Sequence, residues 1–376
     1  MKPLTITDGS AEIVRGALSM GVDFFAGYPI TPASRIYEAM IEVGLGVGCP
    51  DEITVAQTLI GASLAGKKAM TATSAPGFAL MLESLGGAFM TEVPLSLVLV
   101  QRMGPSVGSA TTSAQGDVLA PLALSGGYTL PTLCPPRLED CARLMADVVN
   151  LSEALRCPVM LLTEREMVSA KRTLRLDDQS ETLLTLPAPV ERERFEGDAK
   201  DFKPYGNLNT EQVPPFLEAG NEQTQVRFTV STHGEAGAIL KATPEAIRNT
   251  MRLQEKIDAF ADRCPQPRMD LEVGARILVL SYGCTDYAAR EAVIALREGG
   301  SKVSHVTMLT LFPVQEEPLR MALEGIDTVI IPEENQFGLY RQWLSGKGLF
   351  EGRRVIGINQ IGGLVSPEDI ITGAAA

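Results

Sequence analysis

Apolar residues along this chain follow two alternating patterns, short continuous runs and longer stretches with helical spacing, from residue 8 to about residue 165. The run Leu95–Val100 is apolar except for Ser96, as expected of a strand that is buried on both faces. The stretch Arg137–Leu155 instead repeats its apolar residues with the spacing of a helix. Strands that alternate with helices in this way predict an α/β fold, with parallel sheets covered by helices.

The first helix is expected to begin at Asp8, whose carboxylate can cap it, and to end at Gly21. Pro32 suits the first turn of a further helix. The other elements expected in this part of the chain are strands at 23–26, 68–73, 95–100 and 159–162 and helices at 52–66, 76–90 and 137–155.

Between about residues 170 and 270 the alternation stops. Charge runs and the pair Pro214-Pro215 replace it, and only Met251–Asp262 has a clear helical pattern. The alternation then returns, with strands expected at 276–281, 302–308, 328–332 and 355–358 and a helix at 286–297. We therefore expect an α/β domain at 1–190, a connector segment at 191–270 and a second α/β domain at 271–376.

Charge and cysteine content narrow the function classes. The net charge of −13 disfavours a nucleic-acid-binding surface, which would need a basic stripe. No apolar run is long enough for a membrane span, and the N-terminus lacks the apolar core of a signal peptide. The six cysteines include no Cys-x-x-Cys pair, which favours buried free thiols over a zinc site or an iron–sulfur cluster on this chain. We expect a cytoplasmic protein without a metal site of its own.

Four short motifs within the first 110 residues point to a ligand site. Each falls where a strand gives way to a helix or where a helix begins, and ligands of open α/β sheets bind at the carboxyl ends of strands. The motifs are Gly27-Tyr28-Pro29-Ile30-Thr31-Pro32, Asp51-Glu52, Thr73-Ser74-Ala75-Pro76-Gly77 and Val100-Gln101-Arg102-Met103-Gly104-Pro105-Ser106.

Glu52 is the first candidate for chemistry. It opens an apolar helix and could lie at a water-poor edge, where a carboxyl group can share a proton near neutral pH. Acidic residues are also common in first helical turns because they favour the helix dipole, so a purely structural role stays open. His233 stands out because the chain has only two histidines, although a lone histidine is more often structural. Glu333-Glu334-Asn335 closes a strand and is expected to be solvated.

The remaining candidates each have a structural alternative. Thr31, which lies between two prolines, could hydrogen-bond an oxo or carboxylate group or could cap its own helix. Arg102 could hold a carboxylate through two hydrogen bonds or form a structural ion pair. The turn Thr73–Gly77 could bring backbone N–H groups to a ligand, or Ser74 could simply cap the next helix.

Taken in order, these motifs resemble the α subunit of 2-oxoacid:ferredoxin oxidoreductases, most closely the 2-oxoglutarate type. The resemblance covers nearly the whole chain and rests on Phe24–Pro32, Thr71–Phe78, Val100–Arg102, Gln115–Asp117 and Pro332–Gly338. It implies that 1–190 is a thiamine diphosphate-enzyme pyrimidine-binding domain and that 271–376 is a transketolase-C-terminal-like domain.

The resemblance also implies roles for single residues. Glu52 would be the carboxylate that activates thiamine diphosphate, while Thr31 and Arg102 would contact the 2-oxoacid end of the substrate. Further substrate contacts would come from Ser106 and His233. The other cofactor-binding residues would be Tyr28, Pro29, Ile30, Ser74 and Gly77.

The half of such a site that binds the diphosphate and its metal ion has no counterpart in the sequence. The resemblance implies that a β subunit supplies this half, with Mg²⁺ and a [4Fe–4S] cluster, in an (αβ)₂ assembly. The reaction would convert 2-oxoglutarate, coenzyme A and oxidised ferredoxin to succinyl-CoA, CO₂ and reduced ferredoxin, or run in the carboxylating direction.

Three places depart from the family's usual pattern. Pro50 stands where another Glu is usual, and Gly234 stands where an Asp usually follows the histidine. The segment after Arg102 has Met103 and Val107 where Gly and Thr are usual. The alternatives are therefore the same chemistry on pyruvate or branched-chain 2-oxoacids, or a non-catalytic binding or scaffold protein that kept the fold.

Overall fold

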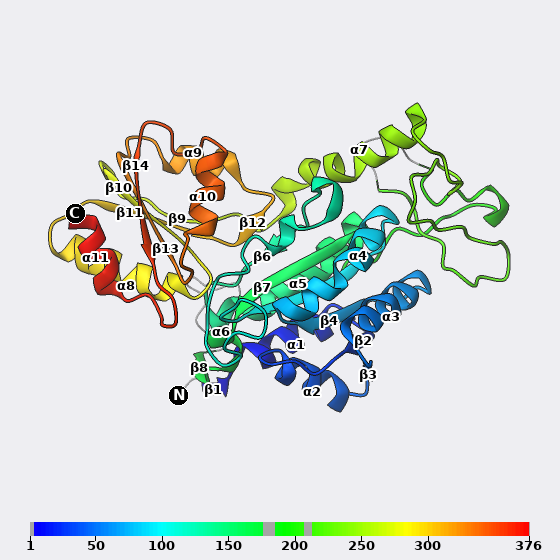
Figure 1. The fold of residues 1–376 in the computed structure, drawn as a ribbon, viewed down its shortest axis with the longest axis horizontal. Coiled ribbons are helices and arrows are strands. Elements are labelled where there is room, and N and C mark those ends of the chain that lie inside the picture. The colour runs from blue at the N-terminus through cyan, green and yellow to red at the C-terminus, as the bar shows by residue number, and fades with distance from the viewer. Residues whose placement is uncertain (1–3, 176–184, 207–212, 376) are drawn as a thin grey trace.

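The structure is a computed structural model that describes residues 4–175, 185–206 and 213–375. Two α/β units lie side by side, and a long irregular segment with helix α7 (Pro244–Ala259) connects them (Figure 1). The predicted α/β class with helix-covered parallel sheets is confirmed. No helix in the described ranges is both long and apolar enough to cross a membrane.

The first unit is built on a seven-stranded sheet with the order β12-β6-β7-β5-β4-β2-β3. Strands β2 to β7 pair in parallel, so their carboxyl ends lie at one edge of the sheet, here named the C-terminal edge. The opposite edge is named the N-terminal edge. The strands are β2 (Phe24–Gly27), β3 (Gly46–Gly48), β4 (Ala69–Thr73), β5 (Leu95–Gln101), β6 (Thr132–Leu133), β7 (Pro158–Glu164) and β12 (Thr310–Phe312).

Helices cover this sheet because its central strands are apolar at almost every position. Strands β4, β5 and β7 are buried along their whole length, which requires cover on both faces. The helix pairs α1–α5 and α3–α4 provide it. The helices of this unit are α1 (Gly9–Ser19), α2 (Ser34–Glu42), α3 (Glu52–Leu64), α4 (Ala75–Met90), α5 (Leu138–Leu155) and α6 (Arg165–Ser169).

Local signals in the sequence set the starts of several helices. Asp8 accepts the backbone N–H of Ala11 at 3.1 Å and caps α1, as predicted. Pro32 was expected in a first helical turn, but α2 begins at Ser34, so Pro32 lies in the preceding turn. Helix α7 begins earlier than predicted, because Thr243 caps it and Pro244 occupies its first position.

The second unit has a five-stranded sheet with the order β14-β13-β10-β11-β9, parallel except at the edge strand β9. Helices α8 and α11 pack together on it. The strands are β9 (Arg268–Asp270), β10 (Ile277–Tyr282), β11 (Val303–Met308), β13 (Thr328–Glu333) and β14 (Arg354–Asn359). The helices are α8 (Thr285–Glu298), α9 (Glu316–Ala322), α10 (Leu339–Gly346) and α11 (Pro367–Ala375).

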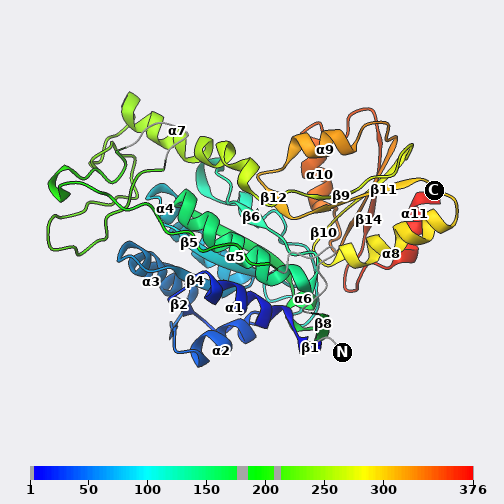
Figure 2. The same ribbon diagram turned by 180° about the vertical axis from the view of Figure 1, so that it is seen from behind.

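The two units share more than a linker. Strand β12 follows β11 of the second unit but pairs with β6 of the first sheet. A separate two-stranded sheet joins β1 (Leu4–Thr7) to β8 (Arg172–Arg175). The second unit lies beyond the C-terminal edge, and the irregular segment before α7 lies toward the N-terminal edge (Figure 2). Short 3₁₀ turns complete the described elements at Ala120–Leu122, Ser125–Gly127, Ala199–Asp201 and Ala261–Arg263.

Candidate active site

Most of the predicted site residues meet at the C-terminal edge of the first sheet. Tyr28 to Thr31 follow β2, Ser74 follows β4 and Arg102 follows β5. The parallel register places these strand ends next to one another. The loop after β2 is held in place by packing, because a Cβ atom at Gly27 would lie 2.7 Å from the rings of both Phe25 and Tyr37.

Glu52 is buried in the first turn of α3, with 5% of its surface exposed. Asp51 caps this helix by accepting the Thr54 N–H at 2.7 Å, and that hydrogen bond lowers the pKa of the Asp51 carboxyl. The Glu52 carboxyl reaches the first turn of α4. A Cβ atom at Gly77 would lie 2.5 Å from Glu52 Oε1 and 2.2 Å from Thr73 Oγ1, so a larger residue there would displace these side chains.

Ser74 is the residue before α4, but its side chain does not cap that helix. The side chain is fully buried, and its hydroxyl has no hydrogen-bond partner among the described residues. A buried hydroxyl without a partner costs free energy unless a ligand or water satisfies it. The Ser74 hydroxyl could therefore hydrogen-bond a ligand beside Glu52, and the missing side chain at Gly77 leaves space for that ligand.

Arg102 and Thr31 are brought into direct contact. Arg102 Nη1 donates a hydrogen bond to the Thr31 carbonyl oxygen, and Arg102 is 6% exposed. The Arg102 Nε atom is buried without a partner in the described part of the chain. Thr31 does not cap α2, because the capping position is Ala33 and no side chain bonds there. The arginine therefore holds the loop after β2 and keeps an N–H donor free.

The other predicted residues of the loop after β2 are accessible. Tyr28 is 39% exposed, Pro29 is exposed and Ile30 is half-buried. Ser106 lies in an exposed turn after Arg102, with φ +55°, a backbone conformation that non-glycine residues seldom adopt. The turn is closed by the Met103 carbonyl, which accepts the Ser109 N–H at 2.8 Å. Outliers of this kind concentrate at functional sites.

His233 is not brought to this cluster. It is fully buried and stacks on Tyr205 with 3.8 Å between ring centroids, and burial lowers its pKa. Its carbonyl accepts the side-chain N–H of Asn249, on α7, beside the buried Glu92. Glu92 lies three residues before the start of β5, so His233 lies at the N-terminal edge. Within this chain, a direct role for His233 beside Arg102 has no support.

Sequence reasoning missed a second group of polar residues at the C-terminal edge. Asp117 lies beside Arg102, and burial raises its pKa to about 6 although Arg102 acts in the opposite direction. Burial also raises the pKa of Glu164, at the end of β7, to about 7 and that of Glu334 to about 8. The expectation that Glu333 and Glu334 form a solvated strand end is wrong, because both are at most 2% exposed.

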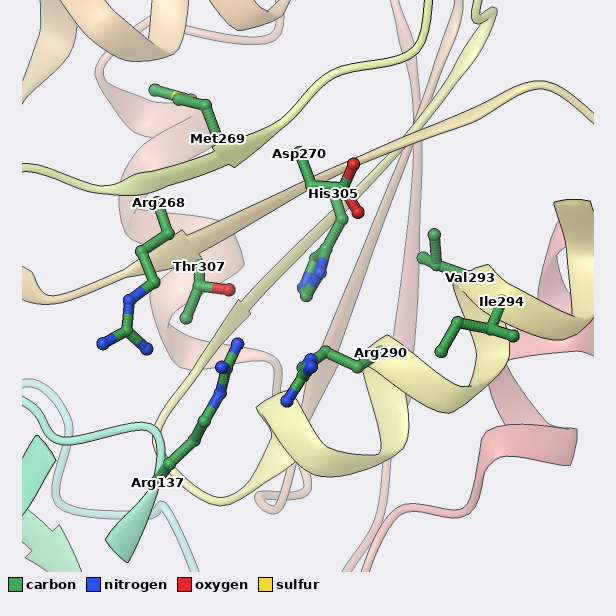
Figure 3. A pocket seen from close by; sticks show the side chains of 9 residues that line it. All are labelled: Arg137, Arg268, Met269, Asp270, Arg290, Val293, Ile294, His305 and Thr307. Carbon is green, nitrogen blue, oxygen red and sulfur yellow. The ribbon is translucent and has the colours of Figure 1, made fainter. Parts of the chain in front are cut away.

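A separate cavity of about 440 Å³ lies in the second unit (Figure 3). None of the predicted site residues lines it. Its wall carries several guanidinium groups, of which Arg268 pairs with Asp140 and Arg137 with the buried Asp286. The lining residues are Arg137, Arg268, Met269, Asp270, Arg290, Val293, Ile294, His305 and Thr307.

The cysteines are free thiols, and all except the half-buried Cys49 are buried. Within residues 4–175, 185–206 and 213–375, no group of three or more His, Cys, Asp or Glu side chains is placed to hold a metal ion.

The family model and the similar proteins all indicate the same protein family. The model of the family "Pyruvate flavodoxin/ferredoxin oxidoreductase, thiamine diphosphate-binding" matches residues 15–251. The 2-oxoglutarate synthase subunit KorA of Methanothermobacter thermautotrophicus is 34% identical over 87% of this chain and 86% of the relative. The KorA subunit of Methanocaldococcus jannaschii is 31% identical over 96% of each chain.

Solved structures agree. The 2-oxoglutarate:ferredoxin oxidoreductase from Magnetococcus marinus, with 2-oxoglutarate, coenzyme A and succinyl-CoA bound, matches with a TM-score of 0.89 and 28% identity. The match covers 100% of this chain and 65% of that chain. A split-gene transketolase, described as an inactive β4 tetramer, matches with a TM-score of 0.56 and 10% identity, which is a likeness of fold alone.

Proposed function

This chain belongs to the pyruvate flavodoxin/ferredoxin oxidoreductase family, and from that premise we propose that it is the α subunit of a 2-oxoglutarate:ferredoxin oxidoreductase. The proposed reaction is 2-oxoglutarate, coenzyme A and oxidised ferredoxin to succinyl-CoA, CO₂ and reduced ferredoxin, with carboxylation as the reverse direction. The names of the KorA relatives and the ligands in the Magnetococcus marinus structure support this substrate.

The observation that carries the proposal is the buried Glu52 carboxyl against Gly77, on the same sheet edge as the Arg102–Thr31 contact. Thiamine diphosphate, when bound, supplies the carbon nucleophile for the 2-oxo group. In our proposal Glu52 holds the aminopyrimidine ring and shares a proton with it, as a carboxyl group in a water-poor site can do. Ser74 and Gly77 would lie against the same ring, and the neighbouring Tyr28, Pro29 and Ile30 would border it.

Arg102 would bind the 2-oxoacid carboxylate. A guanidinium group is permanently charged and offers several N–H donors in one plane, a geometry that matches a carboxylate. One of these donors already binds the Thr31 carbonyl. In our proposal the Thr31 side chain would contact the same substrate group. Ser106, on the exposed turn that follows Arg102, would contact the distal part of the substrate.

The proposal requires a partner subunit, in keeping with the naming of the relatives as subunits. We propose that this β subunit carries the diphosphate-binding half, Mg²⁺ and a [4Fe–4S] cluster, that the assembly is (αβ)₂ and that ferredoxin is the electron acceptor. Ile53 follows Glu52 on α3, and Leu80 lies three residues after Gly77 on α4. Both side chains are about half exposed and would be covered by this partner.

The decisive experiment reconstitutes the two-subunit complex and measures dye reduction that depends on coenzyme A and each of several 2-oxoacids. Glu52→Gln should lower kcat by a factor of about 100 or more, because the amide cannot share a proton in the same way. Glu42→Gln, at an exposed position on α2, is the control and should leave kcat unchanged. Full turnover by Glu52→Gln would refute the catalytic assignment, and a strong preference for pyruvate would refute the substrate.

A further inference from the structure

Two segments that are far apart in the sequence meet where the second unit contacts the C-terminal edge. Gln115 donates its backbone N–H to the Glu334 carbonyl at 2.8 Å, and Gln115 Oε1 accepts the Glu334 N–H at 3.0 Å. Asn335 Nδ2 adds a bond to the Gln115 carbonyl at 3.3 Å. These contacts join the loop after β5 to the end of β13.

Gln115 also binds the end of β7. Its Nε2 donates to Glu164 Oε1 at 2.8 Å and to the Tyr282 carbonyl at 3.2 Å. The second unit packs closely against the same carboxyl group at Gly283. A Cβ atom at that residue would lie 1.9 Å from Glu164 Oε1. Gln115 is fully buried, so three elements fix the orientation of its amide.

Glu164 and Glu334 lie at this junction between the two units, and their carboxyl groups are buried. Among the described residues, the groups with the strongest influence on their pKa include no cation. Glu164 Oε2 and Glu334 Oε2 have no hydrogen-bond partner in the described residues. The strongest influences on them, besides burial and their mutual repulsion, are neutral or acidic: Gln115, Cys284, Ser113, Glu166 and the Val365 backbone. Adjacent buried carboxylates without a cation cannot both be ionised at low cost.

We propose that Glu164 and Glu334 are positioning residues that hold a proton across the junction, and that this proton keeps Gln115 and the loop beside Arg102 in the substrate-binding arrangement. The inference rests on the proposed function, because it concerns the 2-oxoacid site of that function. It adds the requirement that the Glu164–Glu334 pair holds a proton for substrate binding, although neither residue is proposed to contact the cofactor or the substrate.

The path from the junction to Arg102 is short. Gln101 is the register partner of Glu164 at the end of the β5–β7 ladder. Gln101 Oε1 accepts the Asp117 N–H at 3.1 Å, and Asp117 lies beside Arg102. Loss of the proton would leave two ionised carboxylates buried in the junction, where the charge of Glu164 acts on Glu334. Their repulsion would loosen the bonds of Gln115 that hold residues 115–117.

Asp117 is a neighbouring titratable group whose ionisation could also affect substrate binding, because it lies beside Arg102. Burial raises the pKa of Tyr282 and of the nearby cysteines well above their usual values, so these groups stay neutral. Asp117 titrates lower, with a pKa that burial raises to about 6. The cysteines near the two carboxyl groups are Cys134, Cys141 and Cys284, and the other acidic neighbours are Glu166 and Glu333. Arg102 is the charged group beside Asp117.

The first test detects the proton itself in the two-subunit complex. Infrared difference spectra recorded from about pH 6 to about pH 9 should show a protonated-carboxyl band that disappears in this range. Glu164→Gln and Glu334→Gln should each remove most of that titrating band. Glu153→Gln is the matched control, because Glu153 is equally buried but pairs with Arg192 at the N-terminal edge. Absence of the band in the parent, or its equal loss in Glu153→Gln, would overturn the proposal.

The second test links the proton to substrate binding. The KM of the parent complex for 2-oxoglutarate should rise about fivefold over the same pH range, with less than about a twofold change in kcat. The double variant Glu164→Gln/Glu334→Gln should keep only the smaller rise of KM near pH 6 that follows from ionisation of Asp117, and the single variant Glu334→Gln replaces it if the double variant does not assemble. An equal rise of KM in parent and variant would overturn the proposal. If no 2-oxoacid is oxidised at all, the proposed function fails, and the infrared titration still decides whether the proton is held.

Discussion

The two edges of the first sheet bury acidic side chains in opposite ways. At the N-terminal edge, Glu92 is fully buried and paired with Arg252 and with Lys256, whose Nζ lies 2.8 Å from Glu92 Oε2. At the C-terminal edge, Glu164 and Glu334 are just as buried but each keeps an oxygen without a partner in the described residues. The same depth of burial therefore gives a fixed charge at one edge and a group that can titrate at the other.

Cations account for the difference. Burial alone would raise the pKa of Glu92, but the charges of Lys256, Arg252 and Arg156 outweigh it and lower that pKa to about 2. At the C-terminal edge the strongest influences on Glu164 among the described residues include no cation, and burial raises the pKa of Glu164 to about 7. Ionisable groups whose pKa moves toward neutrality concentrate at functional sites, whereas fully paired networks serve the fold.

Ion pairs and hydrogen bonds at the N-terminal edge also hold the irregular segment before α7 in place. Arg156 Nη1 donates to the Pro214 carbonyl at 2.7 Å, and Arg192 pairs with Glu153 at 2.6 Å. The guanidinium groups of both arginines lie over the ring of Phe216. Buried charged groups thus help to fix a segment that has isolated β-bridges but little regular structure.

The largest effect is expected from breaking the paired edge. Glu92→Ala should lower the free energy of unfolding by about 3–5 kcal/mol, because it leaves buried cations without their carboxylate. Glu218→Ala, which removes an exposed pair with Arg194, is the control and should cost about 0–1 kcal/mol. Denaturant unfolding of the complex measures both, and equal losses would contradict the network.

The pH dependence of this contribution has a definite sign. The pKa of Glu92 is lower in the folded protein, so the stabilisation is fully present above its unfolded value of 4.5. It is lost as the pH falls toward about 2. The raised pKa values at the C-terminal edge act in the opposite direction, and their contribution is lost as the pH rises through about 7 to 8.

A larger side chain at the C-terminal edge should cause the next largest loss in the free energy of unfolding. Gly283→Ala places a Cβ atom against the Glu164 carboxyl at a residue with φ +54°, and we expect a loss of about 2–4 kcal/mol. Gly325→Ala is matched for a positive φ, +73°, but has open space, and should cost about 1 kcal/mol. Thermal unfolding separates the two, and equal losses would argue against a tight junction.

A smaller effect separates capping from catalysis. Asp51→Ala and Asp8→Ala each remove a helix cap and should lower the melting temperature by about 1–3 °C. Only Asp51→Ala should also reduce turnover, because Asp51 fixes the helix end that carries Glu52. Melting curves and dye-reduction rates of the complex test this, and unchanged turnover in Asp51→Ala would weaken the assignment of Glu52.

The smallest effect concerns Asp117. The backbone N–H and the charge of Arg102 both stabilise the Asp117 carboxylate. In our proposal that carboxylate would compete with the substrate for Arg102, so Asp117→Asn should lower the KM for 2-oxoglutarate about two- to threefold above about pH 6. Below that pH the parent group is already protonated, since burial raises its pKa to about 6, and the difference should vanish. Steady-state kinetics across pH measure this, and a KM that rises in the variant would assign Asp117 a purely structural role.

The sequence predicted the central strands well because burial on both faces leaves continuous apolar runs such as Leu95–Val100. It did not predict β3, β6 or β12, which have two or three residues each and owe their strand conformation to a neighbouring strand. Helices α9, α10 and α11 were also not predicted. The contact of Thr31 with Arg102 agrees with the predicted cluster, although the catalytic roles of these residues stay predictions.

The sequence by itself therefore determined the α/β class, the main helices and the candidate residues at the strand ends, because these follow from local apolar patterns and from chain direction. Only the tertiary structure decided which acidic residues are charged. The residues next to Glu92, Glu164 and Glu334 in the sequence do not determine their protonation, which depends on cations and carboxyls that other elements bring from far along the chain. It also decided that His233 and Glu52 lie at opposite edges, since that distance is a property of the folded sheet.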